Sequence, residues 1–261
     1  MNLRKLFIPL VNISEAILEL FFPPRCGICE KIQPRFSFKD KTYLCSDCRK
    51  KLHFVRDFSS NCKKCSRPIE HDSLICYVCQ VTQKHFDAAF SCTIYKSEIR
   101  EALLLYKFGD SRHKYRAFAE IMLNEMKNIS PFPNIDVICQ VPSGKKRKKK
   151  RGFDHTLEIT KYIARKTGLS HSPKAIIKLK DTIPQSKLNF KERQEAVKGA
   201  FKINIPSDIR GKSVLLIDDI YTTGATASEV SKILKRAGAK SVFVLTLCIT
   251  QTIDIGDDFK I

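Results

Sequence analysis

The sequence predicts an α/β fold, in which a mainly parallel sheet with helices on both faces follows a cysteine-rich module. Two observations predict it. From residue 86 onward, short apolar runs alternate with segments of helical periodicity, and this β-α-β rhythm is typical of a parallel sheet. Before that point, eight of the eleven cysteines of the 261-residue chain form four C-x-x-C pairs. A length of about 150 residues per domain suggests one domain plus a smaller module, and we place the boundaries at residues 1–22, 23–85 and 86–261.

Residues 1–22 predict an amphipathic helix. The stretch is largely apolar, but Glu15 and Glu19 lie inside it, which argues against a transmembrane span. Pro23 and Pro24 follow it in place of the small residues of a secretory cleavage site. We expect the helix to pack on the core, and contact with a membrane surface or a partner is the alternative. Without a secretory signal, we expect a cytoplasmic protein with reduced thiols.

The paired cysteines predict two structural zinc sites. Two C-x-x-C turns joined by a hairpin can direct four thiolates to one Zn²⁺ ion, and four thiolates leave no position for a reacting water. Disulfides are the alternative, which a reducing compartment disfavours. The simplest pairing is sequential, although an interleaved pairing also fits the spacing. The expected ligands are Cys26, Cys29, Cys45 and Cys48 for one ion and Cys62, Cys65, Cys76 and Cys79 for the other.

The later elements follow from hydrophobic periodicity and from glycine or proline at their ends. We expect strands at residues 90–95, 135–141, 213–217 and 241–248, and helices at 97–108, 115–127, 153–166 and 225–237. The continuous apolar run from Val214 to Ile217 is typical of a central strand buried on both faces. Cys92, Cys139 and Cys248 lie in apolar, strand-like contexts and are expected in the core.

The most informative segment is residues 214–226, where a buried strand ends in Asp218 and Asp219 and a hydroxyl-rich turn opens the next helix. Backbone N–H groups at a helix N-terminus have no intrahelical partner and carry partial positive charge, so they hold phosphate. The two carboxylates can accept hydrogen bonds from ribose hydroxyls or bind Mg²⁺. The segment therefore predicts a site for a phosphorylated sugar. An ordinary strand-turn-helix junction is the alternative.

Seven consecutive cations at residues 145–151 form a predicted loop after the strand at 135–141. Ligands of open α/β sheets bind beyond the carboxyl ends of the strands, so this run should lie at the same edge as Asp218 and Asp219. A net charge of +20 suggests a polyanionic partner, nucleic acid foremost. Pyrophosphate is a second candidate, and a solvated loop is the alternative. The polar segment at 184–201, which includes Arg193, either folds over the site or is an exposed connection.

The 214–226 segment resembles the phosphoribosyl pyrophosphate (PRPP) motif of type I phosphoribosyltransferases. The order of motifs from about residue 21 to residue 248 resembles the ComF family of competence proteins. The resemblance rests on the paired C-x-x-C turns, Tyr106-Lys107-Phe108-Gly109, Val141-Pro142, Arg151-Gly152-Phe153-Asp154, Gln185, Arg193 and the 214–226 segment.

This resemblance implies a type I phosphoribosyltransferase fold with a double zinc ribbon and PRPP with Mg²⁺ as the ligand. It also implies a cytoplasmic role in natural transformation, with single-stranded DNA and competence-machinery proteins as partners. Asp218 and Asp219 would meet the ribose hydroxyls and are the candidate catalytic residues. The expected PRPP contacts are Tyr221, Thr222, Thr223, Gly224, Ala225, Thr226, Val141, Pro142, Ser143, Gly144, Lys145 and Arg151. The expected nucleic-acid contacts are Lys145, Lys146, Arg147, Lys148, Lys149, Lys150 and Arg151.

Two functions follow from this resemblance. The first is a PRPP-binding accessory that handles incoming single-stranded DNA. The second is an active phosphoribosyltransferase that releases pyrophosphate onto a nitrogen acceptor which the sequence does not identify. Amidophosphoribosyltransferases need a glutaminase domain with a nucleophilic N-terminal cysteine. Because this sequence opens Met1-Asn2-Leu3, we expect no such domain here. A zinc-dependent scaffold with a vestigial pocket is a third possibility.

Overall fold

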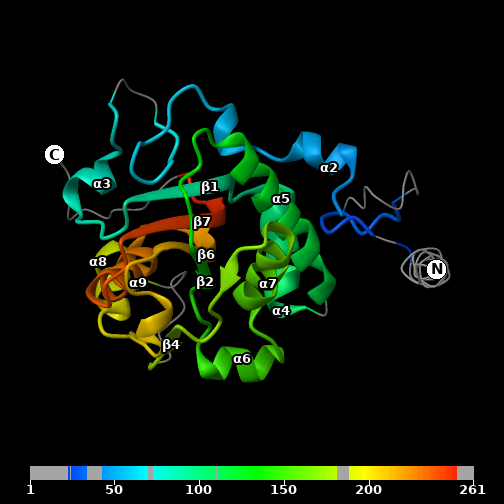
Figure 1. Ribbon diagram of the computed structural model, residues 1–261. Helices are drawn as coiled ribbons and strands as arrows, with labels where there is room; N and C mark the ends of the chain where they lie inside the picture. Colours follow the sequence, from blue (N-terminus) through cyan, green and yellow to red (C-terminus); the bar gives the residue numbers. More distant parts are fainter. Residues whose placement is uncertain are drawn as a thin grey trace, which may run out of the picture.

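The computed structural model describes residues 23, 25–33, 43–69, 73–109, 111–180 and 188–251. The helix predicted for residues 1–22 and the predicted contact Gln185 lie outside these residues. A five-stranded sheet with the order β1-β7-β6-β2-β3 forms the centre, and all neighbouring strands are parallel (Figure 1). Its strands are β1 (Ala88–Ile94), β2 (Val137–Gln140), β3 (Ser170–His171), β6 (Ser213–Tyr221) and β7 (Ser241–Ile249). The predicted parallel sheet is confirmed, and the apolar run at 214–217 lies in its middle strand.

Side chains of β6 alternate between the two faces of the sheet. Val214 and Leu216 join the core on the face covered by α8 and α9, whereas Leu215 and Ile217 join the core under α4, α5 and α7. These helices are α4 (Ser97–Phe108), α5 (Tyr115–Asn128), α7 (His155–Thr167), α8 (Phe190–Val197) and α9 (Ala225–Arg236). Helices therefore cover both faces, as the β-α-β rhythm predicts.

A small antiparallel pair flanks α8. It consists of β4 (Ile176–Lys178) and β5 (Phe201–Ile203), and a short helix η4 (Pro206–Asp208) leads from it to β6. A capping box begins α8, because the Asn189 side chain accepts from the Glu192 N–H while the Glu192 side chain accepts from the Asn189 N–H. Arg193 lies in this helix. Within the part of the predicted 184–201 connection that the structure describes, Phe190–Val197 is thus helical and Phe201 begins β5.

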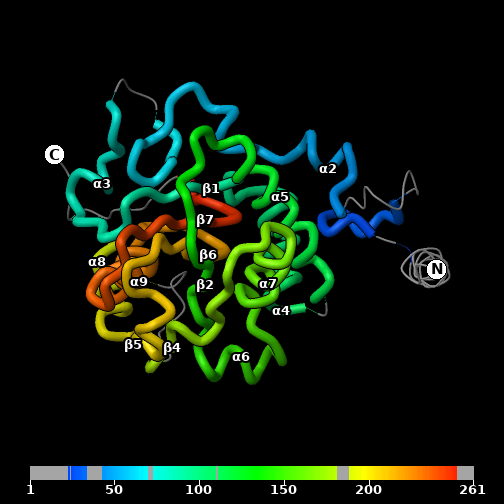
Figure 2. The backbone as a smooth tube through the Cα atoms, viewed as in Figure 1, coloured from blue at the N-terminus to red at the C-terminus, as the bar shows by residue number. Residues whose placement is uncertain are grey.

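The cysteine-rich module forms two lobes, which lie apart along the β1 side of the molecule (Figure 2). The first lobe contains α2 (Ser46–Lys51) and packs against α5. A Cβ on Gly27 would lie 2.4 Å from the Cβ of Ala117, so the bare glycine allows this close approach. The second lobe contains α3 (Tyr77–Val81) and contacts the edge strand β1, where the N–H of Ala89 donates to the carbonyl of Lys64 at 2.9 Å. A short helix η1 (Val55–Asp57) joins the lobes.

The cationic run forms the helix α6 (Lys145–Arg151), and the prediction of a loop was wrong. Lysine and arginine are good helix formers, Gly144 provides the N-cap, and Gly152 ends the helix in the left-handed conformation with φ +79°. None of the seven side chains is buried, so solvent and salt screen their mutual repulsion. Among the described residues, no helix combines the length and apolar character needed to cross a membrane.

The remaining boundaries agree closely with the expected elements. The helices at 97–108 and 225–237 appear as Ser97–Phe108 and Ala225–Arg236. Cys92, Cys139 and Cys248 are all buried, as predicted. The division into residues 1–22, 23–85 and 86–261 stays a prediction.

Candidate functional site

Asp218 and Asp219 lie inside β6, not after it as the sequence suggested, because the strand continues to Tyr221. Pairing of β6 with β7 extends to Tyr221, whereas its pairing with β2 stops at Ile217. Ile220 and Tyr221 favour extended structure, and β7 still supplies their backbone partners. The two carboxylates therefore lie where β6 has a partner strand on one side only.

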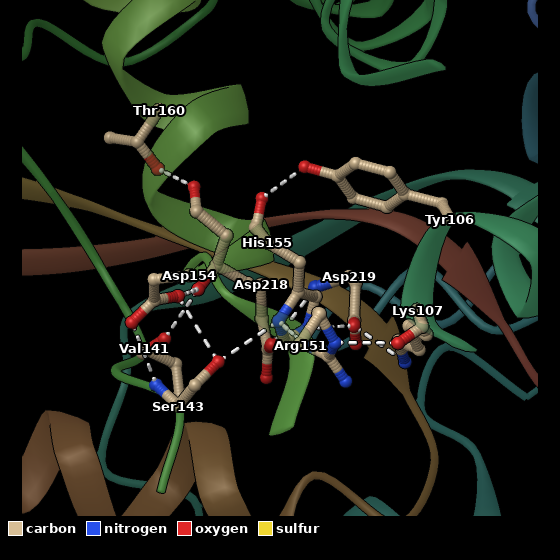
Figure 3. Close-up of polar contacts among 11 residues, drawn as sticks. Tyr106, Lys107, Val141, Ser143, Arg151, Asp154, His155, Thr160, Asp218 and Asp219 are labelled. Atoms are coloured by element: carbon tan, nitrogen blue, oxygen red, sulfur yellow. Dashed lines mark hydrogen bonds and ion pairs between the residues drawn. The ribbon is translucent and has the colours of Figure 1, made fainter. Parts of the chain in front are cut away.

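Asp219 is the centre of a buried polar cluster (Figure 3). Its Oδ2 lies 2.5 Å from the Nζ of Lys107, in the last turn of α4, and accepts a hydrogen bond from the Nε2 of His155, the first residue of α7. One carboxylate thus joins β6 to two helices that are distant in the sequence.

His155 uses both of its ring nitrogens. Because Nε2 donates to Asp219, Nδ1 is the acceptor of a neutral ring, and the Nη1 of Arg151 lies 2.5 Å from it. The same guanidinium donates through Nε to the carbonyl of Lys107 at 2.6 Å. Burial lowers the pKa of His155, and the cations Lys107 and Arg151 act in the same direction while Asp219 opposes them. The imidazole is therefore neutral at physiological pH.

The two carboxyl groups have opposite pKa shifts. Burial by itself would raise the pKa of Asp219, but Lys107 and then His155 outweigh it and hold the pKa well below its usual range. Burial, and then the charge of Asp219, raise the pKa of Asp218 to about 8. The N–H of Asp219 donates to Oδ1 of Asp218 at 2.9 Å. Asp219 is thus ionised in the unliganded protein, and Asp218 takes up a proton near neutral pH.

We expect Asp218→Asn to stabilise the protein, and more at pH 8 than at pH 5. The folded-state pKa of Asp218 lies above the unfolded value of about 3.9, so the folded state binds more protons between these values and stability falls as pH rises through that window. The amide does not ionise and escapes this loss. Thermal unfolding at both pH values measures the effect, with the exposed Asp57→Asn as control. An equal gain at both pH values, or a larger one at pH 5, contradicts this assignment.

The loop after β2 is held by Asp154. Its carboxylate accepts from the N–H of Ser143 at 3.2 Å and from the hydroxyl of Ser143 at 3.1 Å. The hydroxyl of Thr156 donates to the carbonyl of Val141 at 2.7 Å. Since Ser143 Oγ also lies 2.9 Å from the Nδ1 of His155, the loop that carries the expected PRPP contacts at residues 141–145 borders the carboxylate cluster (Figure 3).

The turn between β6 and α9 has the geometry expected of a phosphate loop. Gly224 has φ +77°, and a Cβ there would lie 2.1 Å from the hydroxyl of Tyr221. Thr223 is fully buried, and its Oγ1 accepts from the N–H of Ala225 at 3.3 Å, so this hydroxyl faces the interior. Thr222 and Thr226 are half-buried. The N–H groups of Thr223 and Gly224 donate to no described residue, which leaves them available to an anion.

The Tyr221 ring lies beneath this turn. It is buried and packs edge-on against Phe86, with ring centroids 6.2 Å apart. Its hydroxyl has no hydrogen-bond partner among the described residues. The Tyr221 ring thus supports the turn by packing, and the PRPP contact at this residue stays a prediction.

The eight paired cysteines form two quartets, one of Cys26, Cys29, Cys45 and Cys48 and one of Cys62, Cys65, Cys76 and Cys79. Within each quartet all sulfur atoms lie within 4.8 Å of one another, and the Sγ atoms of Cys65 and Cys76 are 3.6 Å apart. Tetrahedral Zn²⁺ with bonds of about 2.3 Å places its sulfurs about 3.8 Å apart. The donor set and spacing fit two structural zinc sites, and they select the sequential pairing.

Next to the carboxylate cluster, α6 and the end of α4 form a basic and aromatic surface. Phe108 has a side chain that is 75% exposed, and the guanidinium carbon of Arg151 lies 5.8 Å from its ring centroid. Leu105, one turn earlier, is half exposed. The surface therefore joins the cations of α6 to an open aromatic face, which we call the α6 platform.

The structure brings Lys107 and Arg151 to the predicted site, as their motifs suggested. Sequence reasoning did not single out His155, because one histidine after Asp154 carries no spacing pattern. It also missed Arg67 and Lys84 in the second lobe, since their partners are backbone carbonyls distant in the sequence. A contact of that kind has no sequence signature.

Two domain families match the chain. The double zinc ribbon domain covers residues 17–80, and the phosphoribosyl transferase domain covers residues 137–256. The second range contains β2, α6, β6, α9 and β7, which carry the two carboxylates, the β6–α9 turn and the cationic helix.

Two curated relatives span most of the chain. The DNA utilization protein YhgH of Salmonella typhi is 28% identical over 210 residues, which are 79% of this chain and 90% of the relative. Competence protein ComFC of Streptococcus pneumoniae is 28% identical over 211 residues, 80% of this chain and 88% of the relative. Among solved structures, the glutamine PRPP amidotransferase from B. subtilis, complexed with ADP and GMP, is 19% identical with a TM-score of 0.36, over 55% of this chain and 30% of that one. The chain therefore carries a double zinc ribbon and a phosphoribosyl transferase domain, and it is a homologue of competence protein ComFC and of YhgH, as its resemblance to the ComF family predicted.

Proposed function

We propose that this protein binds PRPP with Mg²⁺ at the junction of β6 and α9 and handles incoming single-stranded DNA in the cytoplasm during natural transformation. The observation that carries the proposal is the carboxylate pair in the central strand, followed at once by a left-handed Gly224 turn whose N–H groups at Thr223 and Gly224 donate to no residue that the structure describes. The match to a phosphoribosyl transferase domain supports the ligand, and the name of ComFC supports the competence role.

The residues fit the ligand in two parts. The N–H groups of Thr223 and Gly224, together with the N-terminus of α9, suit the 5′-phosphate. Asp218 and Asp219 offer the oxygen atoms that ribose hydroxyls and Mg²⁺ prefer. Mg²⁺ would neutralise the pyrophosphate when bound, and Lys107 would be released from Asp219 as the carboxylate turns to the sugar.

The test is calorimetric titration of the zinc-loaded protein with PRPP and Mg²⁺. We expect binding by the wild type and a loss of at least about a hundredfold in Asp218→Asn/Asp219→Asn, which is roughly 2.7 kcal/mol. Asp57→Asn, an exposed site in η1, serves as the matched control. Wild-type protein that does not bind PRPP, or a double variant that binds as well as wild type, overturns the proposal.

For single-stranded DNA we propose the α6 platform as the contact surface. Its cations suit phosphates, and Phe108 offers a face on which a base can stack, a contact worth about 1–3 kcal/mol. The cationic helix, the exposed ring and the guanidinium of Arg151 are adjacent. Together they match the two features that sequence-tolerant single-strand binders combine.

We expect replacement of Lys148, Lys149 and Lys150 by glutamine to weaken single-stranded DNA binding and to flatten its salt dependence by about 2, because each lost phosphate contact removes about 0.7 from the slope of log K against log salt. Three other exposed lysines, Lys198, Lys202 and Lys240, form the control set. Fluorescence anisotropy with an oligothymidine at several salt concentrations measures both quantities. If both triple variants change the slope equally, DNA binding depends on the overall positive charge of the protein and not on the α6 platform.

The phosphoribosyl transferase match also favours a second candidate function, transfer of the phosphoribosyl group to a nitrogen acceptor with release of pyrophosphate. Catalysis would then rest on positioning and electrostatics. In the unliganded site, Asp219 and His155 are hydrogen-bonded to each other. Pyrophosphate release with an acceptor, lost in Asp218→Asn/Asp219→Asn, would establish this activity, and its absence across nucleobase and amine acceptors would leave the binding function.

A further inference from the structure

The second zinc lobe reaches directly into the phosphate loop. Arg67 lies two positions after the ligand Cys65, and its Nη2 donates to the carbonyl of Thr222 at 2.5 Å. Lys84 lies five positions after Cys79, and its Nζ donates to the carbonyl of Thr223 at 2.7 Å. The lobe thus holds two consecutive carbonyls of the loop.

These two contacts fix the direction of the loop's free donors. In a trans peptide the C=O and the following N–H point in opposite directions. A Thr222 carbonyl held toward Arg67 turns the N–H of Thr223 away from the zinc lobe, and a Thr223 carbonyl held toward Lys84 does the same for the N–H of Gly224. These are the two N–H groups that donate to no described residue. The lobe therefore orients the groups that would hold a phosphate.

Arg67 also ties the loop to the end of β7. Its Nη1 donates to the carbonyl of Gln251 at 3.2 Å and to the carbonyl of Thr250. The side chain is buried, and all of these partners are backbone carbonyls. One guanidinium therefore joins the zinc lobe, the phosphate loop and the last strand of the sheet.

The positive charges of Arg67 and Lys84 are balanced by the negative charge of the zinc site. Among the described residues, neither Arg67 nor Lys84 forms a salt bridge with a carboxylate. A Zn²⁺ ion bound by four thiolates has a net negative charge. Burial lowers the pKa of Lys84, and the thiolates of Cys79, Cys65 and Cys76 act against that shift. The thiolates that hold the metal thus supply the counter-charge for the cations behind the loop.

The first lobe has different contacts. The Nζ of Lys114, the last residue of η2 (Arg112–Lys114), donates to the carbonyl of Gly27 at 2.9 Å and to the Glu30 carboxylate. Gly27 also packs against Ala117 of α5. Cys26 and Cys48 belong to the core on the α4, α5 and α7 face, whereas Cys62, Cys65 and Cys76 belong to the core on the α9 face. The two zinc sites thus support opposite faces of the sheet.

We infer that the second zinc ribbon is a brace for the phosphate loop, with Arg67 and Lys84 as positioning residues, so that affinity for a sugar phosphate depends on the Cys62–Cys79 site and not on the Cys26–Cys48 site. The claim about affinity for a sugar phosphate rests on the proposed function, whereas the claim that the lobe braces the loop does not.

The first experiment compares variants that keep both zinc sites. Arg67→Gln and Lys84→Met remove the contacts to the loop, whereas Lys64→Met removes a contact of the same lobe with the carbonyls of Phe86 and Asp87. Calorimetry with ribose 5-phosphate measures affinity, and ¹⁵N relaxation without ligand measures the order of the Thr223 and Gly224 amides. Zinc content is determined for every protein.

We expect Arg67→Gln and Lys84→Met each to weaken ribose 5-phosphate binding about tenfold, since a hydrogen bond from a charged donor is worth roughly 1.5–3 kcal/mol. We expect the order parameters of both amides to fall below about 0.6 in these variants. Lys84→Arg keeps charge and donor and should retain affinity, as should Lys64→Met. Unchanged order parameters in Arg67→Gln and Lys84→Met overturn the inference. If wild-type protein fails to bind ribose 5-phosphate, the proposed ligand is wrong, and the relaxation data still decide the brace.

The second experiment compares the two metal sites. Cys79→Ser and Cys29→Ser each alter one ligand of one quartet, and released zinc is measured for both. We expect order at Thr223 and Gly224 and ribose 5-phosphate affinity to fall in Cys79→Ser only. Equal losses in both variants, or none in Cys79→Ser after its zinc is gone, contradict the inference.

Discussion

Gly224→Ala is expected to abolish PRPP binding while the protein stays folded. The new Cβ would lie 2.1 Å from the Tyr221 hydroxyl and 2.5 Å from its ring carbon Cζ, and the ring cannot retreat because it is buried against Phe86. The backbone at φ +77° adds strain of about 1–2 kcal/mol for any residue with a Cβ. The turn must therefore move, and the N–H groups of Thr223 and Gly224 lose their direction. We expect a loss of affinity of at least about a hundredfold.

Gly168→Ala separates the strain from the steric conflict. Gly168 ends α7 at φ +73°, and a Cβ there would meet nothing within 4 Å. Both variants should lose a similar small amount of stability from the left-handed backbone, and Gly224→Ala should lose more through its steric conflict with Tyr221. Only Gly224→Ala should lose PRPP binding. Thermal unfolding and calorimetry on the same preparations check this. PRPP affinity in Gly224→Ala within threefold of Gly168→Ala would show that this turn does not hold the phosphate.

Removal of zinc is expected to have the largest effect on stability. Structural zinc contributes about 10–16 kcal/mol of apparent binding free energy per site in zinc-finger peptides. Because the lobes are short and their cysteines are part of the two cores, we expect a strong chelator to release two zinc ions per chain and to unfold both lobes. The parallel sheet should remain, since its strands pair with one another over most of their length.

Limited proteolysis and far-ultraviolet circular dichroism report this outcome. We expect new cleavage within residues 43–81 and a protected fragment that contains β1 to β7. Chelator saturated with zinc beforehand is the control. Complete unfolding of the sheet, or a release of fewer than two zinc ions, would contradict the assignment of two independent structural sites.

The sequence predicted the sheet well because its strands are nearly continuous apolar runs. Val214 to Ile217 indicated a buried central strand, and Gly238 indicated the C-terminal end of α9. The cysteine spacing predicted both zinc quartets, since tetrahedral thiolate binding tolerates few arrangements. Local pattern was sufficient in these cases.

Contacts between segments that are distant in the sequence could not be predicted from it. The run at 145–151 forms a helix and not the predicted loop, because the helix propensity of lysine and arginine outweighs the repulsion between cations that are not buried. His155 meets Asp219, and Arg67 meets Thr222, only after the sheet has formed. Tertiary packing decides such pairs, and no spacing rule encodes them.

The structure of the protein with Mg²⁺ and PRPP tests the central claim most directly. We predict the 5′-phosphate at the N–H groups of Thr223 and Gly224, the ribose hydroxyls at Asp218 and Asp219, and the ion pair between Lys107 and Asp219 broken. PRPP found only along α6, with that ion pair and the phosphate loop unchanged, would contradict the account and leave the protein as a polyanion-binding scaffold.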